Sequence, residues 1–121
     1  MPAPVSDLAG MLAGMSPVLD AQRWRFMLLE GEAPAYAFAL IREDEGTTAI
    51  VPDEGGEFAR ITLMVHSALE GVGLTAAVSG VLAADGIACN IIAGFHHDHL
   101  FVPWARRDEA LALLQRLSQT G

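Results

Sequence analysis

Two spacings of hydrophobic residues recur along the chain, and they predict different elements in its first half. Leu8–Met15 places apolar residues at i, i+3, i+4 and i+7 behind Ser6, a good N-cap, which predicts a short amphipathic helix. Three extended runs follow, separated by segments rich in glycine, proline and acidic residues, which favours an antiparallel meander. These runs are Arg23–Glu30, Ala35–Glu43 and Thr47–Val51.

Strand and helix patterns alternate more clearly in the second half. Ile61, Leu63 and Val65 alternate with more polar residues, as in a half-buried strand. A helical stripe follows and ends at Gly86, which can supply a left-handed C-cap. The predicted order is β-α-β-β-α, over Ile61–His66, Leu74–Asp85, Ile87–Phe95, His99–Pro103 and Arg106–Ser118.

This element order predicts an α+β fold of the ferredoxin-like type, in which helices cover one face of an antiparallel sheet. The acidic, glycine-rich segment Pro52–Gly56 is the predicted boundary between a smaller αβββ half, residues 1–57, and the βαββα domain, residues 58–121. One strand of the full ferredoxin-like unit is missing. We expect its position to be filled by a strand of the first half or of another subunit, because an unpaired edge promotes association.

Composition restricts the classes of function. The chain has 121 residues, 52% hydrophobic and 18% charged, so it can bury a core and is predicted to fold. Its net charge of −8, with seven cations that are all arginine, argues against nucleic acid as a partner. We therefore assign Trp24 and Trp104 to packing, although Trp24 lies between two arginines and Arg106 and Arg107 follow shortly after Trp104. The single cysteine excludes an internal disulfide and a multi-cysteine zinc site.

Targeting and catalytic signals are missing from the sequence. No apolar run approaches the roughly 20 residues of a membrane span. The amino terminus lacks the basic region and apolar core of a secretory signal. We therefore predict a cytoplasmic protein with no membrane partner. We predict no enzyme and no cofactor, because no nucleophile–base pair or spaced carboxylate pair is found at a plausible site.

The run from Ile61 to Pro103, ITLMVHSALEGVGLTAAVSGVLAADGIACNIIAGFHHDHLFVP, resembles the ACT domain, a βαββαβ regulatory module that commonly binds amino acids. The shared features are a strand ending in a polar residue, a glycine-bearing loop, a helix and a Gly-Ile pair before the next strand. The chain looks closest to small bacterial ACT-like proteins with a short αβββ segment in front. The resemblance implies an amino-acid effector and a homo-oligomer. The loop departs from the common Asp-x-Pro-Gly pattern, since it reads Glu70–Gly73 (EGVG).

The loop Ser67–Thr75 is the first candidate site. Its glycines at 71 and 73 permit close backbone approach, and the following helix presents unpaired N–H groups that favour a carboxylate. Alternatively, the glycines serve only tight packing of strand against helix, and Thr75 caps the helix. The predicted contacts to an effector are Ser67, Val72, Gly73, Leu74 and Thr75, with His66 at the adjacent strand end. His66 is equally well explained as a partly buried structural residue.

The cluster His96–His99 is the second candidate. Imidazoles and a carboxylate are good metal ligands, but three adjacent ligands seldom close a site alone. The alternatives are a structural turn in which Asp98 accepts backbone N–H bonds, an effector contact through Asp98 or His99, and a metal site. Asn90 could contact a ligand or a neighbouring subunit, or face solvent. Cys89 is predicted to be a small buried hydrophobe.

The sequence thus predicts a regulatory protein without catalysis that binds a small molecule, and the resemblance implies that this molecule is an amino acid. Two alternatives remain: a metal-binding module that uses His96–His99, and a domain that serves only oligomerisation.

Overall fold

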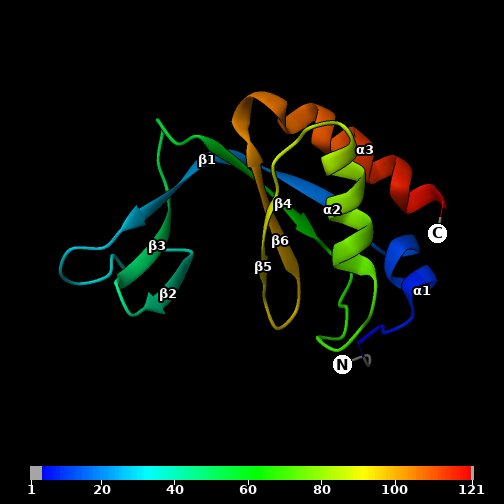
Figure 1. Ribbon diagram of the computed structural model, residues 1–121, viewed down its shortest axis with the longest axis horizontal. Coiled ribbons are helices and arrows are strands. Elements are labelled where there is room, and N and C mark those ends of the chain that lie inside the picture. The colour runs from blue at the N-terminus through cyan, green and yellow to red at the C-terminus, as the bar shows by residue number, and fades with distance from the viewer. Residues whose placement is uncertain (1–3, 121) are drawn as a thin grey trace.

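A computed structural model describes residues 4–120 of the chain. Six strands form one antiparallel sheet in the order β2-β3-β1-β4-β6-β5, together with three helices (Figure 1). A 3₁₀ turn, η1 (Trp104–Arg106), precedes the last helix. The strands are β1 (Pro17–Leu28), β2 (Ala39–Glu43), β3 (Gly46–Pro52), β4 (Phe58–Leu63), β5 (Asn90–Ala93) and β6 (Asp98–Pro103), and the helices are α1 (Leu8–Ala13), α2 (Leu74–Ala84) and α3 (Arg107–Thr120). Within residues 4–120, no helix is long and apolar enough to cross a membrane.

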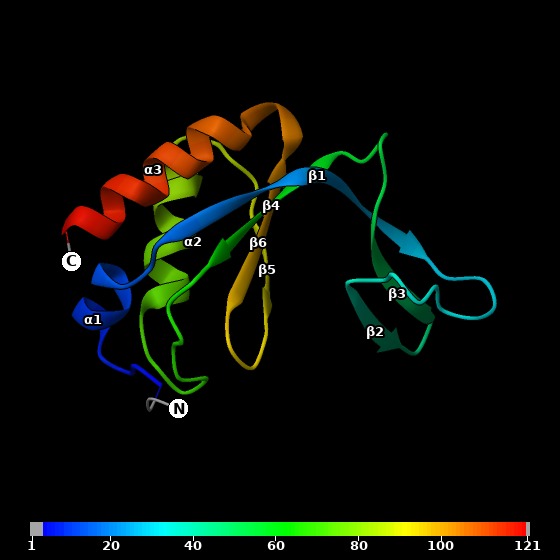
Figure 2. The ribbon, with the colours of Figure 1, turned by 180° about the vertical axis from the view of Figure 1, so that it is seen from behind.

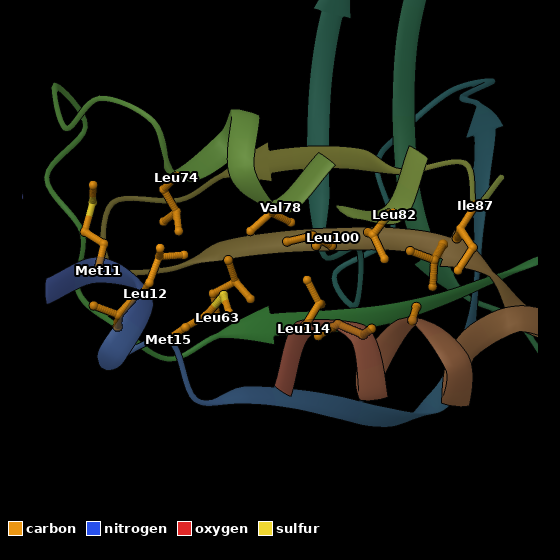
Figure 3. Close-up of a cluster of buried hydrophobic side chains, with 14 of the residues drawn as sticks. Met11, Leu12, Met15, Leu63, Leu74, Val78, Leu82, Ile87, Leu100 and Leu114 are labelled. Atoms are coloured by element: carbon orange, nitrogen blue, oxygen red, sulfur yellow. The ribbon is translucent and has the colours of Figure 1, made fainter. Parts of the chain in front are cut away.

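The second half has the predicted ferredoxin-like arrangement. β6 lies between β4 and β5 and is antiparallel to both. All three helices contribute to one core, which is built on the alternate residues Ala59, Ile61 and Leu63 of β4. Figure 3 shows side chains of α2 and α3 pointing into the same core as Leu63 and Leu100 of the sheet. The structure therefore confirms the α+β fold with helices on one face of the sheet, which the period-2 and helical patterns predicted.

β1 fills the position next to β4 that the second half leaves open. Pro17 pairs with Leu63 and Leu19 pairs with Ile61, both antiparallel. The missing strand therefore comes from the first half of the same chain. The sequence pattern missed residues 17–22, because the register of β1 shifts between Leu19 and Arg23 and this bulge interrupts the alternation of apolar and polar residues.

The predicted meander of the first half is wrong. β3 lies between β2 and β1, and Trp24 to Leu28 of β1 pair with Pro52 to Thr48 of β3. The physical reason is loop length: a two-residue turn at Asp44-Glu45 closes the β2–β3 hairpin, whereas residues 29–38 form a long connection that lets β3 reach β1.

Several predicted boundaries also need correction. The N-cap of α1 is Asp7 rather than Ser6, and its carboxylate accepts a 2.8 Å hydrogen bond from the Gly10 N–H. β4 ends at Leu63, not His66, because the following backbone turns toward the amino-terminal segment. β5 covers only Asn90–Ala93, because residues 87–89 have no ladder partner in the described chain.

The sheet curls so that the β2–β3 hairpin covers part of the face that the helices leave free (Figures 1 and 2). Trp24, Ile50 and Phe101 are buried in this second cluster. The Phe38 ring lies with its centroid 6.0 Å from that of Phe101 and 4.8 Å from that of His99. Part of the sheet face opposite the helices is thus covered by the same chain.

Candidate functional site

The loop between β4 and α2 is held by the amino-terminal segment. The Val5 N–H donates to the His66 carbonyl oxygen at 2.8 Å, and the Ala68 N–H donates to the Val5 carbonyl oxygen at 2.8 Å. The Gly71 N–H closes a turn onto the Ala68 carbonyl oxygen at 3.0 Å. These backbone bonds fix the path of the chain into α2.

The amino end of α2 has no side-chain cap. Gly73 occupies the N-cap position with φ = 105°, a left-handed conformation that favours glycine. The predicted alternative, in which Thr75 caps the helix, is not observed. The first N–H groups of α2 have no acceptor within the helix, so they can bind an anionic group.

Both loop glycines are also tightly packed. A Cβ at Gly71 would lie 3.0 Å from the Met11 Sδ, and one at Gly73 would lie 3.3 Å from a Leu8 methyl carbon. The two glycines therefore let the loop pack closely against α1, a different contact from the predicted one between strand and helix. A valine at Gly73 would strain the backbone, so it is not a clean test of ligand binding.

Four predicted site residues meet at one small pocket of about 80 Å³: Ser67, Leu74, Thr75 and Asp98. The Ser67 hydroxyl donates to the Asp98 carboxylate at 3.3 Å. Ala68, Leu69 and Gly71 of the predicted loop also line the pocket, and two further residues, Met11 and Ala93, were missed. Met11 was identifiable only as a core residue of the first helix, because its approach to the loop depends on tertiary packing.

The other predicted residues lie elsewhere. Val72 is 82% exposed on the loop, and Asn90 is exposed at the start of β5, whereas the end of β5 reaches the pocket through Ala93. The His66 ring is 6.3 Å from that of Phe95 and 5.4 Å from that of His96, measured between centroids. His66 therefore belongs to an aromatic group beside the loop rather than to the pocket lining.

The histidine cluster is divided between the two sheet faces. Asp98 lines the pocket on the helix side, whereas His99 contacts Phe38 on the opposite side. Among residues 4–120, no three His, Cys, Asp or Glu side chains are grouped so that they could hold a metal ion. Strand alternation explains this separation, because neighbouring residues on a strand point to opposite faces.

The surroundings of His99 favour its neutral form. Its Nδ1 lies 2.9 Å from the Thr62 hydroxyl, and burial together with the positive charge of Arg60 lowers its pKa below the ordinary 6.5. The unfolded chain therefore binds a proton at His99 at a higher pH than the folded chain does. Protonation of this residue opposes folding.

We expect acidification to destabilise the protein through His99. The free energy of unfolding should fall as the pH drops below about 6.5, because the unfolded state gains the proton at a higher pH than the folded state does. Urea denaturation across this pH range measures the effect. The His99→Gln variant should lose part of the pH dependence, and the exposed control His96→Gln should retain the His99 contribution. An identical pH dependence in wild type and His99→Gln would contradict the assignment.

Cys89 packs against the main core from a half-buried position. Burial raises the pKa of its thiol to about 11, so the thiol is protonated at neutral pH and unreactive as a nucleophile. It precedes β5, so the predicted strand position is wrong, although its packing against the core agrees with a structural role.

An antiparallel sheet of ferredoxin-like type, with a small pocket at the amino end of α2, indicates the class to which the protein belongs. Two family models of the ACT domain match the chain, one over residues 3–66 and the other over residues 59–116. The protein belongs to the ACT-domain family. ACT domains are regulatory modules that bind small molecules and often oligomerise.

Solved structures give the same fold. A protein of unknown function from Vibrio cholerae, described as a possible transport protein, is 39% identical, with a TM-score of 0.78 over 92% of this chain and 95% of its own. The ligand-free regulatory subunit of aspartate kinase from Thermus thermophilus is 10% identical, with a TM-score of 0.65 over 86% of this chain and 97% of its own. The second likeness shows the fold alone. No curated protein matches the chain.

Proposed function

We propose that the protein is a non-catalytic sensor that binds a free amino acid in the pocket formed by Ser67, Leu74, Thr75 and Asp98. The observation that carries this proposal is the meeting of the Asp98 carboxylate with the uncapped amino end of α2. The Asp98 carboxylate attracts an ammonium group, and the amino end of α2 attracts a carboxylate. A zwitterion satisfies both, whereas a simple organic anion would be repelled by Asp98.

The size of the pocket supports recognition of the amino-acid head group. About 80 Å³ is too small for a drug-sized ligand, which typically occupies roughly 300–1,000 Å³. The effector's side chain would extend past Leu69, which lines the pocket and is 70% exposed. Specificity would then depend on the surface around the loop.

A regulatory role without catalysis agrees with the chemistry of the pocket. Ser67, one of the two hydroxyl side chains that line the pocket, donates to a carboxylate rather than to a histidine base, so it has no activating partner among the described residues. We also propose a cytoplasmic homodimer. The exposed apolar side chains of Leu69, Val72 and Phe95 support self-association, and the single protonated cysteine is compatible with a reducing compartment.

Calorimetric titration of the twenty standard amino acids tests the proposed site. We expect at least one to bind, and Asp98→Asn to weaken it by about tenfold, because an ammonium–carboxylate hydrogen bond is lost. Asp44→Asn, in the exposed β2–β3 turn, is the matched control and should bind as wild type does. Undiminished affinity in a folded Asp98→Asn variant would place the effector elsewhere.

A further inference from the structure

A larger pocket lies at the opposite end of the second-half sheet. Leu63 of β4 pairs with Asp98 near the amino-acid pocket, whereas Phe58 at the other end of β4 pairs with Pro103, which leads into η1 (Figure 1). At this second end there is a pocket of about 450 Å³, within the range typical of small-ligand sites. It is lined by Ala21, Gln22, Arg23, Pro52, Asp53, Glu54 and Trp104.

The β1 bulge builds this pocket. Leu19 pairs with Ile61 and Arg23 pairs with Ala59, so three residues of β1 lie opposite the single residue Arg60. Pairing with β3 begins only at Trp24, so the bulged backbone has no β3 partner on its other side. Bulges of this kind occur frequently beside functional sites, where they redirect side chains.

Arg23 is held in place with its charged end unpartnered. Its Nε donates to the Gly56 carbonyl oxygen at 2.8 Å, and its Cζ lies 4.8 Å from the centre of the Trp104 ring. The Arg107 Cζ lies 3.8 Å from the same ring. Among the described residues, neither guanidinium forms an ion pair, and the terminal nitrogens of Arg23 form no hydrogen bond.

The missing ion pair is informative because carboxylates are abundant. The chain has 15 acidic residues and seven arginines. Nearby arginines do find acidic partners: the Arg25 Nε lies 3.2 Å from the Asp53 carboxylate, and the Arg106 Nε lies 2.7 Å from that of Glu109. Arg23 is thus a preorganised, unneutralised guanidinium in the wall of a pocket, which can bind an oxyanion.

We propose that this pocket binds a small organic monocarboxylate, with its carboxylate on the terminal nitrogens of Arg23 and its apolar body against Trp104, Pro52 and Ala21. Glu54 supplies an unpaired negative charge in the same wall, so a phosphate dianion fits less well than a monoanion. This site is separate from the amino-acid pocket and does not rest on the function proposed there.

Titration with 3-phenylpropionate, monitored by ¹H–¹⁵N correlation spectra, tests the proposal. The protein has two tryptophans, so its two indole N–H resonances can be assigned with a Trp104→Phe variant. We expect a saturable shift of the Trp104 resonance. The matched cation 2-phenylethylamine should give no comparable shift. Absence of a shift with 3-phenylpropionate, or stronger binding of the amine, would overturn the proposal.

Variants identify the charged contact. Arg23→Gln should weaken 3-phenylpropionate binding by about tenfold, because a charge-assisted hydrogen bond is lost. Glu54→Gln, at an exposed position, should strengthen binding and remains informative if Arg23→Gln fails to fold. Arg42→Gln, on distant β2, and Asp98→Asn should leave affinity unchanged. Undiminished affinity in a folded Arg23→Gln variant would show that Arg23 does not hold the carboxylate. No gain in Glu54→Gln would show that the carboxylate binds away from this wall of the pocket, which also overturns the proposal.

Discussion

A chain comprising residues 58–121 alone should fail to unfold cooperatively, although it contains the whole βαββα pattern. Without the first half, β4 loses its ladder with β1 from Pro17 to Trp24. The main core also loses Met11 and Met15, whose exposed fractions are 1% and 0% in the full chain. The remaining sheet would have an unpaired edge and an uncovered core, both of which promote unfolding or aggregation.

Amide hydrogen exchange and thermal denaturation measure this loss. The protection of the β4 and β6 backbone amides against hydrogen exchange should fall to near zero in the 58–121 chain. A rearranged chain provides the control: Ser16 and Pro17 line the same hollow as Ser118 and Gln119, so a short linker can join the end of α3 to the start of β1. Residues 58–120 followed by 16–28 should recover a cooperative transition. Equal protection in the 58–121 chain and the full chain would instead show that the halves fold independently.

Replacement of Gly56 by alanine should cost about 3 kcal/mol of unfolding free energy, because the new methyl group meets backbone atoms that cannot move aside. A Cβ at this position would contact the Trp24 carbonyl oxygen and lie 2.6 Å from its carbonyl carbon and 2.8 Å from its nitrogen. Relief of this overlap requires the β3–β4 turn to move away from β1. The Gly56 carbonyl that accepts from Arg23 would move with it.

Urea denaturation measures this cost, and the adjacent glycine provides the control. A Cβ at Gly55 would have an ordinary 3.5 Å contact with the Asp53 carboxylate, so Gly55→Ala should change stability by no more than about 0.5 kcal/mol. Equal effects of the two substitutions would show that the turn adapts to an added methyl group. The close approach to Trp24 would then have no energetic consequence.

The candidate site was only partly predictable from the sequence. Ser67, Leu74 and Thr75 lie in one short segment, so local pattern and the ACT resemblance were sufficient to group them. The sequence also suggested Asp98, yet its hydrogen bond to Ser67 depends on the pairing of β4 with β6. Asn90 and His99 were grouped with the site for their chemistry. Asn90 lies at the start of β5, whereas the end of β5 reaches the pocket, and His99 lies on the opposite face of the sheet from the pocket.

The sequence by itself determined the elements of the second half, because burial on one face imposes a period of two on strands and of 3.6 on helices. The burial of Ile61, Leu63 and Val78 follows directly from that rule. Only the tertiary structure decided that β1 completes this sheet and that β3 separates β1 from β2. Strand order depends on contacts between residues far apart in the chain, and a bulge such as that after Leu19 removes the local periodicity that would reveal them.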